Sequence, residues 1–203
     1  MTVWIRKLLF VTGVSVLLAA CSLLPEPKQV VLDRYLLEYS PASVQPSAAN
    51  LPMLLVTVPV ANGAYDSSRI AYMPQQYGLR YYTRSRWVDT PANMLAPLLA
   101  DAISATGRFQ ILNTGAGRAS ADLRLDTELT QFHQDFTVQP SVMHITLRAQ
   151  LVNLREQHVL ATQVFDMREP AQTDDTYGGV QAANRAMATL LQDLASFCIQ
   201  YSP

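Results

Sequence analysis

The sequence predicts an α+β fold in which a mostly antiparallel sheet carries two main helices within a single domain. Three observations lead to this prediction. Apolar and polar residues alternate in several segments, which is typical of half-buried strands. Two other segments carry an apolar stripe with helical spacing. Hydrophobic residues make up 49% of the 203 residues, which is enough for one compact core.

Residues 1–20 are predicted to be a lipoprotein signal peptide. Arg6 and Lys7 precede an apolar run over 8–20, which is shorter than the roughly 20 residues of a permanent membrane span. The run ends in Leu18-Ala19-Ala20-Cys21, and Leu18 fits a lipobox better than an ordinary cleavage site. We therefore expect cleavage before Cys21. A simple secretory signal and an uncleaved anchor with a buried Cys21 thiol are the alternatives.

Cys21 is the predicted lipidation site. A covalent diacylglycerol and an N-acyl chain on Cys21 are the only added groups that we expect, with no other cofactor and no metal. Two chains are enough for durable membrane attachment, at ~0.8 kcal/mol per buried methylene. Ser22 rather than aspartate follows Cys21, which favours the outer membrane and a domain facing the periplasm. Residues 21–31 are the predicted lipidated N-terminus and tether, and residues 32–203 the domain.

The charge balance excludes a nucleic-acid partner. The chain has 15 basic and 16 acidic residues, and loss of Arg6 and Lys7 with the leader leaves 13 against 16. Cys198, the second cysteine, has no disulfide partner if Cys21 is acylated. Because it falls on an apolar helix face, we expect Cys198 to be a buried, inert thiol.

The first half of the chain is predicted to hold four strands and a helix. The strands lie over 32–39, 53–58, 69–74 and 79–88, with the last two joined around Gln75–Gly78. The second strand is apolar on both faces, so we expect it to be central. Thr90 is the expected N-cap of the helix, with Pro91 at the first position and Gly107 in the C-terminal turn.

The second half is predicted to hold four more strands and a long helix. A short strand over 109–112 is followed by three long alternating strands around 123–129, 143–151 and 159–167. This alternation indicates an antiparallel ribbon with one solvated face. The final helix carries an apolar stripe from Val180 to Cys198 and starts near Asp174, Asp175 or Thr176.

Motifs for catalysis, metal binding and nucleotide binding are missing from the sequence. There is no Gly-x-Ser-x-Gly elbow, and Gly115–Arg118 lacks the ending of a phosphate loop. None of His133, His144 and His158 has metal-ligand spacing, and we expect all three to be solvated structural residues. Asp174 and Asp175 are expected to cap a helix. We therefore predict that the protein is not an enzyme.

One segment combines arginine with aromatic residues. Residues 67–88 contain no acidic residue, and arginine and aromatic residues are enriched at protein interfaces. The candidate partner-binding residues are Arg69, Tyr72, Arg80, Tyr81, Tyr82, Arg84, Arg86 and Trp87. Contact with anionic lipid headgroups is one alternative. An ordinary hairpin, with packed aromatic side chains and solvated arginines, is the other.

Several short segments give the chain a likeness to a known family. They are the lipobox, Tyr35-Leu36-Leu37, Leu79-Arg80-Tyr81-Tyr82, and Trp87 just before the Pro91 helix. On these residues the chain resembles the ABC-type transport auxiliary lipoproteins. The resemblance implies a non-catalytic subunit of a system that moves lipids between two membranes. It implies a mammalian-cell-entry-type substrate-binding protein as partner, with this lipoprotein docking the transporter to the outer membrane.

Two other functions stay open at this point. A lipoprotein of this kind can regulate or assemble another envelope machine, such as a cell-wall synthase or an outer-membrane barrel. Hydrolysis of a lipid or glycan is the third hypothesis, and it depends only on scattered Ser, His and Asp residues. A homo-oligomer is also possible, because exposed strand edges can pair between subunits.

Overall fold

The computed structural model describes residues 31–41, 50–113 and 120–202. The predicted signal peptide, Cys21 and nearly all of the predicted tether lie outside the described residues. The turn expected at Gly115–Arg118 lies outside them as well. From Leu32 onward the chain forms one compact unit. The cleavage site and the lipid anchor therefore stay predictions.

The described residues form nine strands and two helices, which confirms the α+β class. The first part contains β1 (Asp33–Tyr35), β2 (Met53–Val56), β3 (Val60–Ala61), β4 (Arg69–Gln75), β5 (Gly78–Trp87) and α2 (Pro91–Ser104). The second contains β6 (Gln110–Asn113), β7 (Leu123–Asp135), β8 (Val142–Asn153), β9 (His158–Pro170) and α3 (Thr176–Tyr201). The sequence did not predict β3, because two residues after Pro59 are too few to show a period.

The sheet is built around β7. Long antiparallel pairings join β7 to β8 and β8 to β9, and β4 and β5 form an antiparallel hairpin. Along its other edge, β7 pairs successively with β2, β3 and β4 in short parallel pairings. Strand β2 lies between β6 and β7, so its predicted central position is confirmed. At the far side of the hairpin, β1 pairs with β5.

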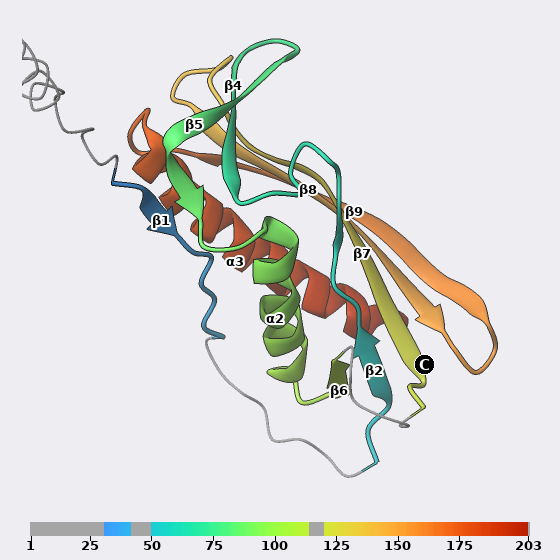
Figure 1. Cartoon of the computed structure of the whole chain (residues 1–203). Coiled ribbons are helices and arrows are strands. Elements are labelled where there is room, and N and C mark those ends of the chain that lie inside the picture. Colours follow the sequence, from blue (N-terminus) through green and yellow to red (C-terminus); the bar gives the residue numbers. More distant parts are fainter. Residues whose placement is uncertain (1–30, 42–49, 114–119, 203) are drawn as a thin grey trace, which may run out of the picture. The chain divides into compact units, whose positions relative to one another are not determined.

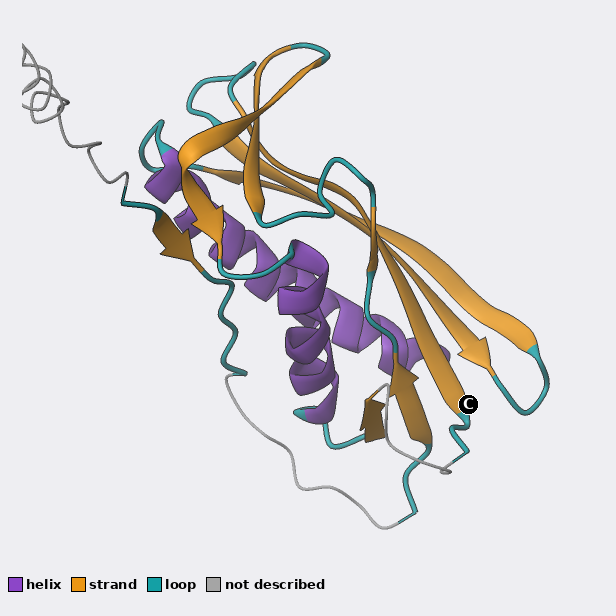
Figure 2. Ribbon diagram, viewed as in Figure 1, coloured by secondary structure: helices purple, strands orange, loops and turns teal. Residues whose placement is uncertain are grey.

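Both helices lie on one face of this sheet, as Figures 1 and 2 show. Helix α2 starts at Pro91, and the Thr90 side chain accepts the Asn93 amide as predicted. Helix α3 starts at Thr176, with Asp175 as its N-cap. The stripe of α3 packs on β8 and β9, and its members Met187, Leu190, Leu191 and Leu194 are fully buried. The core therefore lies between the helices and the ribbon of long strands.

Two local features differ from the predictions. Strand β1 ends at Tyr35 rather than at residue 39, because the next backbone groups bond to a helix side chain. The Glu38 amide donates to Asn184 Oδ1 (2.8 Å), and Asn184 Nδ2 donates to the Leu36 carbonyl. In β7, the register shifts between Leu129 and Gln131. The strand runs to Asp135, beyond its predicted end at residue 129. After the bulge, the side chains that face the core are not the ones that simple alternation predicts.

Cys198 is fully buried in the core, as predicted. Burial raises the pKa of its thiol to about 12, so the thiol stays protonated and unreactive. Within residues 31–41, 50–113 and 120–202, neither helix has the length and apolar character needed to cross a membrane.

Candidate functional site

The β4–β5 hairpin gathers the arginine and aromatic residues that the sequence singled out. Its turn is formed by Gln75–Gly78 as predicted, with Tyr77 at φ 65° and 92% exposed at the tip. The pairing register changes between Arg69 and Ala71, which leaves additional residues on β5. This irregularity lets β5 leave β4 and pair with β1 at residues 85–87.

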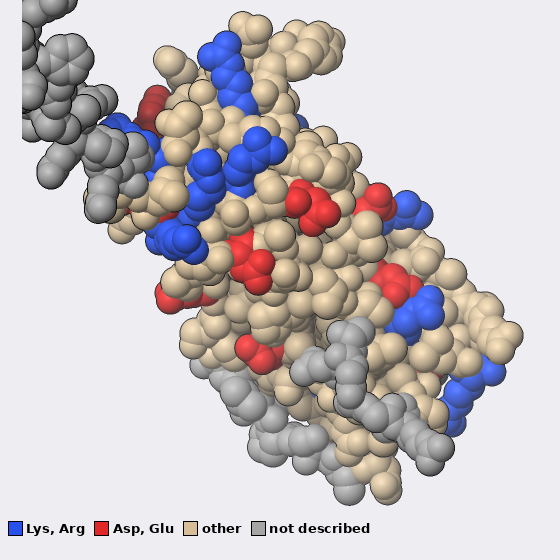
Figure 3. All heavy atoms as spheres, viewed as in Figure 1, with Lys and Arg blue, Asp and Glu red and all other residues tan. Residues whose placement is uncertain are grey.

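Arginines stand side by side across three neighbouring strands. Arg86 of β5 is opposite Arg69 of β4 and also opposite Arg34 of β1. Like charges in directly opposite positions of a sheet are destabilising. Among the residues that the structure describes, no carboxylate lies within 4.0 Å of any of the three. Figure 3 shows basic side chains gathered over this end of the molecule.

Two of the hairpin arginines have internal roles. The guanidinium of Arg69 lies 3.9 Å from the centre of the Tyr81 ring, in a cation–π contact. Arg86 Nη1 donates to the carbonyl of Ser85 (2.8 Å) and to that of Tyr82, which holds the irregular part of β5. Arg80 and Arg84 are exposed and make no such bond within the described part of the chain. We define the arginine surface as Arg34, Arg69, Arg80, Arg84 and Arg86.

The aromatic residues of the segment are mostly packed. Trp87 is 2% exposed and lies 5.4 Å, ring centre to ring centre, from Phe132 in the core. It therefore supports β5 from inside, and its burial argues against its prediction as a partner-binding residue. The Tyr81 hydroxyl donates to the Ala64 carbonyl (2.9 Å), and the Tyr82 hydroxyl to Gln134 Oε1 (2.9 Å).

Arg34 is the functional candidate that sequence reasoning missed. It precedes the hairpin by many residues and joins the arginine surface only because β1 pairs with β5. The available signal was its position on the polar side of a short alternating strand. Partner binding by Arg69, Arg80, Arg84 and Arg86, and by Tyr72, Tyr81 and Tyr82, stays a prediction.

The histidines differ from the prediction that all three are solvated. His158 is half exposed beside Glu156, but His133 is only 2% exposed. The β7 bulge turns His133 to the outer face of the sheet, where the Tyr65 ring stacks on it and the Tyr65 hydroxyl lies 3.0 Å from Nδ1. Burial and the neighbouring His144 lower the pKa of His133 to about 4, so it is neutral.

His144 lies next to His133 and contacts an acidic residue. Its Nε2 is 2.7 Å from Asp166 Oδ1 and 3.2 Å from Thr146 Oγ1, which itself donates to Asp166. In a catalytic triad the nucleophile and the acid occupy opposite nitrogens of the imidazole. Here both neighbours lie at the same nitrogen. The arrangement is a cross-strand hydrogen bond, and it gives the hydrolase hypothesis no geometric support.

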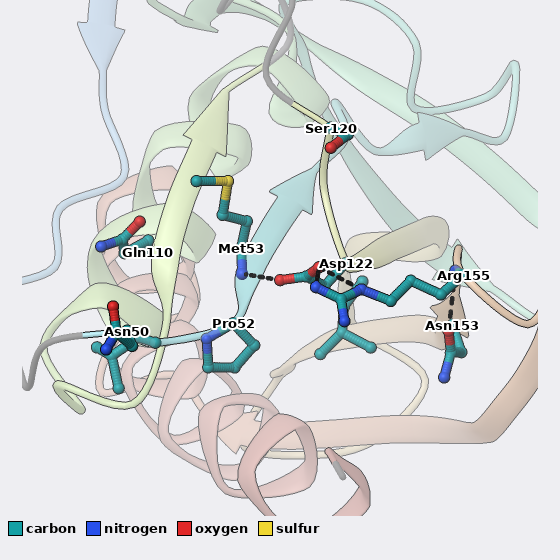
Figure 4. Close-up of a pocket in the computed structure, with 10 residues that line it drawn as sticks. Asn50, Pro52, Met53, Gln110, Ser120, Asp122, Asn153 and Arg155 are labelled. Atoms are coloured by element: carbon teal, nitrogen blue, oxygen red, sulfur yellow. Dashed lines mark hydrogen bonds and ion pairs between the residues drawn. The ribbon is translucent and has the colours of Figure 1, made fainter.

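A separate pocket of about 840 Å³ lies at the opposite end of the sheet, near the start of β2 and β7 (Figure 4). Its central charged groups bind each other. Asp122 accepts the Met53 amide (2.9 Å) and pairs with Arg155 Nε (2.7 Å). The Met53 amide and then Arg155 lower the pKa of the Asp122 carboxyl. This pair connects β2, β7 and the β8–β9 turn, so we assign it a structural role.

No metal site is present in the described ranges. No group of three or more His, Cys, Asp or Glu side chains is arranged there to hold a metal ion.

Comparisons with known proteins agree with this picture. The model of the ABC-type transport auxiliary lipoprotein component family matches residues 35–195, so the chain belongs to that family. It is thus a lipoprotein that serves as an auxiliary component of ABC-type transport. The comparison with curated proteins found no match.

Solved structures show the same fold at low sequence identity. Protein XCC0632 from Xanthomonas campestris is 22% identical with a TM-score of 0.68, over 80% of this chain and 95% of that one. An uncharacterised protein is 13% identical with a TM-score of 0.63, over 82% and 98%. The hypothetical protein CT253 from Chlamydia trachomatis is 6% identical with a TM-score of 0.53, over 74% and 97%. These likenesses concern the fold alone.

Proposed function

We propose that this protein is a non-catalytic, periplasm-facing lipoprotein that docks an ABC-type intermembrane lipid transporter to the outer membrane. Acyl chains on Cys21 hold the protein on the membrane, and the residues up to 31 connect the anchor to the domain. The partner is the mammalian-cell-entry-type substrate-binding protein of the transporter. The family match supports the transport role, and the lipobox supports the anchor.

The arginine surface is the single observation that carries the docking role. Its five arginines share one end of the sheet, and three of them are directly opposite one another across β1, β5 and β4. Such a row stabilises the isolated domain poorly. An acidic protein surface would neutralise it, and guanidinium groups suit carboxylates because they bind them in a two-pronged geometry. Arg80 and Arg84 are the residues most available for this contact.

Binding between purified proteins tests the proposal directly. The full lipoprotein in detergent is immobilised, and the periplasmic substrate-binding protein of the transporter is passed over the surface. We expect saturable binding that weakens as salt rises, because exposed charges are screened. The double variant Arg80→Gln and Arg84→Gln should weaken binding by about tenfold or more, since each lost charge pair removes part of the interfacial attraction.

Arg108→Gln is the matched control, because Arg108 is exposed, lies outside the hairpin and makes no ion pair within the described residues. It removes the same charge from another place and should leave the affinity unchanged within about twofold. Equal weakening by Arg108→Gln would show that net charge, and not this surface, governs binding. Absence of binding by the wild-type protein would refute the docking role.

A further inference from the structure

A hollow of about 460 Å³ lies between the β4–β5 hairpin and the start of α3. The docking surface does not account for it. Its lining combines aromatic rings with acidic side chains. The lining residues are Tyr72, Pro74, Tyr82, Phe136, Asp174, Asp175 and Thr176, and we call this site the aromatic hollow. Its volume falls in the range of small-molecule sites, roughly 300–1,000 Å³.

Three aromatic rings form a corner of the aromatic hollow. The ring centres of Tyr72 and Tyr82 are 4.6 Å apart, and the rings are tilted by 35°. Phe136 is nearly perpendicular to Tyr72, at 82° and 6.0 Å. The face of an aromatic ring carries a partial negative charge. Tyr72 and Tyr82 cover one face of each other, so a cation would be attracted by the ring surface that remains open to the hollow, while its apolar surface stays in contact with carbon.

Buried hydrogen bonds hold the aromatic wall in position. The Tyr82 hydroxyl donates to Gln134 Oε1, and Gln134 Nε2 donates to Ser141 Oγ, each at 2.9 Å. Gln134 is 1% exposed and Ser141 is fully buried. Gln134 fits there because α3 has a glycine beside it: a Cβ on Gly179 would lie 2.3 Å from Gln134 Oε1. The Tyr82 ring is therefore fixed before any ligand arrives.

The two carboxylates of the aromatic hollow are exposed and have no basic side-chain partner within the described residues. Asp174 Oδ1 accepts the Ser141 amide (2.9 Å), and Asp175 Oδ1 accepts the Gly178 amide (2.7 Å) and the Thr173 hydroxyl (3.0 Å). The second oxygen of each makes no hydrogen bond within the described part of the chain. No basic side chain there lies within 4.0 Å of either carboxylate. The backbone amides therefore occupy only one of the two oxygens of each carboxylate.

We propose that the aromatic hollow binds a methylated ammonium cation, such as the trimethylammonium group of choline. Aromatic corners recognise such cations through the ring faces, and Asp174 and Asp175 supply the opposite charge. A primary ammonium group is strongly hydrated and gives up that hydration reluctantly. A methylated one has an apolar surface that suits the rings of Tyr72, Tyr82 and Phe136. The ligand is either free choline or a choline-bearing headgroup.

The ionisation of Tyr82 is consistent with this assignment. Burial is the main cause that raises the pKa of the Tyr82 hydroxyl to about 12; a hydrogen bond with the Thr176 side chain opposes it, and the neighbouring Tyr72 and the charges of Asp175 and Asp174 add to it. The hydroxyl therefore stays neutral and available as a donor to Gln134. The same carboxylate charges that disfavour a phenolate favour a bound cation.

Calorimetry or ligand-observed NMR on the full chain in a non-ionic detergent tests the proposal with choline chloride as the probe. We expect saturable binding, with ethanolamine at least about fivefold weaker because of its hydration. Tyr72→Leu keeps an apolar side chain and removes the ring, so it should weaken choline binding about tenfold. Asp174→Asn and Asp175→Asn together should weaken it several-fold, and asparagine still accepts the same amide bonds.

Matched controls and a second probe complete the test. Asp193→Asn removes an exposed charge elsewhere on α3 and should leave choline affinity unchanged. Glycerophosphocholine distinguishes the sources: binding as tight as that of choline assigns a headgroup, and much weaker binding assigns the free cation. A response no larger than that to sodium chloride, equal or tighter ethanolamine binding, or equal weakening by Asp193→Asn overturns the proposal. The assay contains no transporter component, so its failure leaves the docking proposal untouched.

Discussion

The two halves of the domain use arginine in opposite ways. In the part from 120 to 202, all five arginines lie within 4.0 Å of a carboxylate: Arg124, Arg148, Arg155, Arg168 and Arg185. In the described residues up to 113, none of the six does: Arg34, Arg69, Arg80, Arg84, Arg86 and Arg108. The long-strand ribbon pairs its arginines with carboxylates, whereas in the described residues up to 113 two arginines contact only a ring or backbone carbonyls and none is paired with a carboxylate.

The ribbon and α3 support the fold, whereas the hairpin places arginine side chains at the surface. The ribbon and α3 contain most of the fully buried side chains, and within the described residues the Thr127 hydroxyl is their only buried side-chain polar group without a hydrogen-bond partner. The hairpin takes support from them through Trp87 against Phe132 and Tyr82 against Gln134. Its outward arginines have no such function. Substitutions at inward hairpin residues should therefore change stability, and substitutions at outward ones should change binding.

Trp87→Ala should have the largest effect on stability. Trp87 is 2% exposed in the core, and truncation of a buried tryptophan costs about 3–5 kcal/mol. Urea unfolding followed by circular dichroism measures the loss, with Tyr77→Ala at the exposed hairpin tip as the control. A loss below about 1 kcal/mol would show that Trp87 is not the inward support of the hairpin.

Gly179→Ala tests the contact between α3 and the hairpin. Helix propensity alone favours alanine over glycine by about 1 kcal/mol. Here the new Cβ would lie 2.3 Å from Gln134 Oε1, so the buried Gln134 side chain must shift, which disturbs its bonds to Tyr82 and Ser141. We expect a net destabilisation of about 1–3 kcal/mol in urea unfolding. Gly63→Ala is the matched control, because nothing lies within 4 Å of its Cβ position; a stabilised Gly179→Ala protein would contradict the packing.

His133 should make the ribbon sensitive to acid. Its pKa is lowered to about 4 in the folded protein from 6.5, so the unfolded chain binds the proton first as pH falls. Its contribution is complete above pH 6.5 and should decline by about 2 kcal/mol between pH 7.5 and 5. The groups around His133 are Tyr65, His144, Asp135 and Arg168.

Urea unfolding at several pH values checks this dependence. His133→Gln should flatten the decline between pH 6.5 and 5, whereas His158→Gln, at a half-exposed turn, should leave it in place. The lowered pKa values of Asp122 and Asp166 lie below 3.8, so their losses fall at lower pH and do not overlap this range. An unchanged slope in His133→Gln would mean that His133 is not held neutral by burial.

The sequence predicts the regular part of this molecule well, and it fails where the backbone departs from a period. Alternation places Leu125 and Leu147 in the core, and Asp175 is one of the three cap positions named for α3. The β7 bulge has no marker in the sequence, so the burial of His133 could not be foreseen. Nor could the inward turn of Trp87, because an aromatic residue next to an arginine suits a surface and a core equally well.

The candidate sites show the same limit. Arg80 and Arg84 follow from their spacing within one segment, whereas Arg34 joins them only through the parallel pairing of β1 with β5. The aromatic hollow combines Tyr72 and Tyr82 with Phe136 and Asp174, which come from three separate parts of the chain. Contacts between residues far apart in the sequence bring these side chains together, and a local sequence pattern does not predict such contacts.

Exchanging one arginine in each region gives the smallest effect on stability and the sharpest test of the contrast. Arg148 pairs with Glu128 at 3.5 Å with both side chains about half exposed, and such surface pairs contribute about 0.2–1 kcal/mol. Arg148→Gln should therefore destabilise slightly and leave partner binding intact. Arg84→Gln should leave the unfolding free energy unchanged, because Arg84 has no carboxylate within 4.0 Å in the described residues, and should weaken partner binding.

The test depends on whether each variant affects only one property: Arg148→Gln stability and Arg84→Gln binding. Stability comes from urea unfolding and affinity from the immobilised-lipoprotein assay, both in the same buffer and at the same salt concentration. If both variants weakened binding equally, the partner would respond to overall charge and the hairpin would have no special role. If Arg84→Gln raised stability, the arginine surface would be repelling itself in the free domain, since like charges on neighbouring strands are unfavourable. That result would strengthen the argument that the surface is retained for an acidic partner.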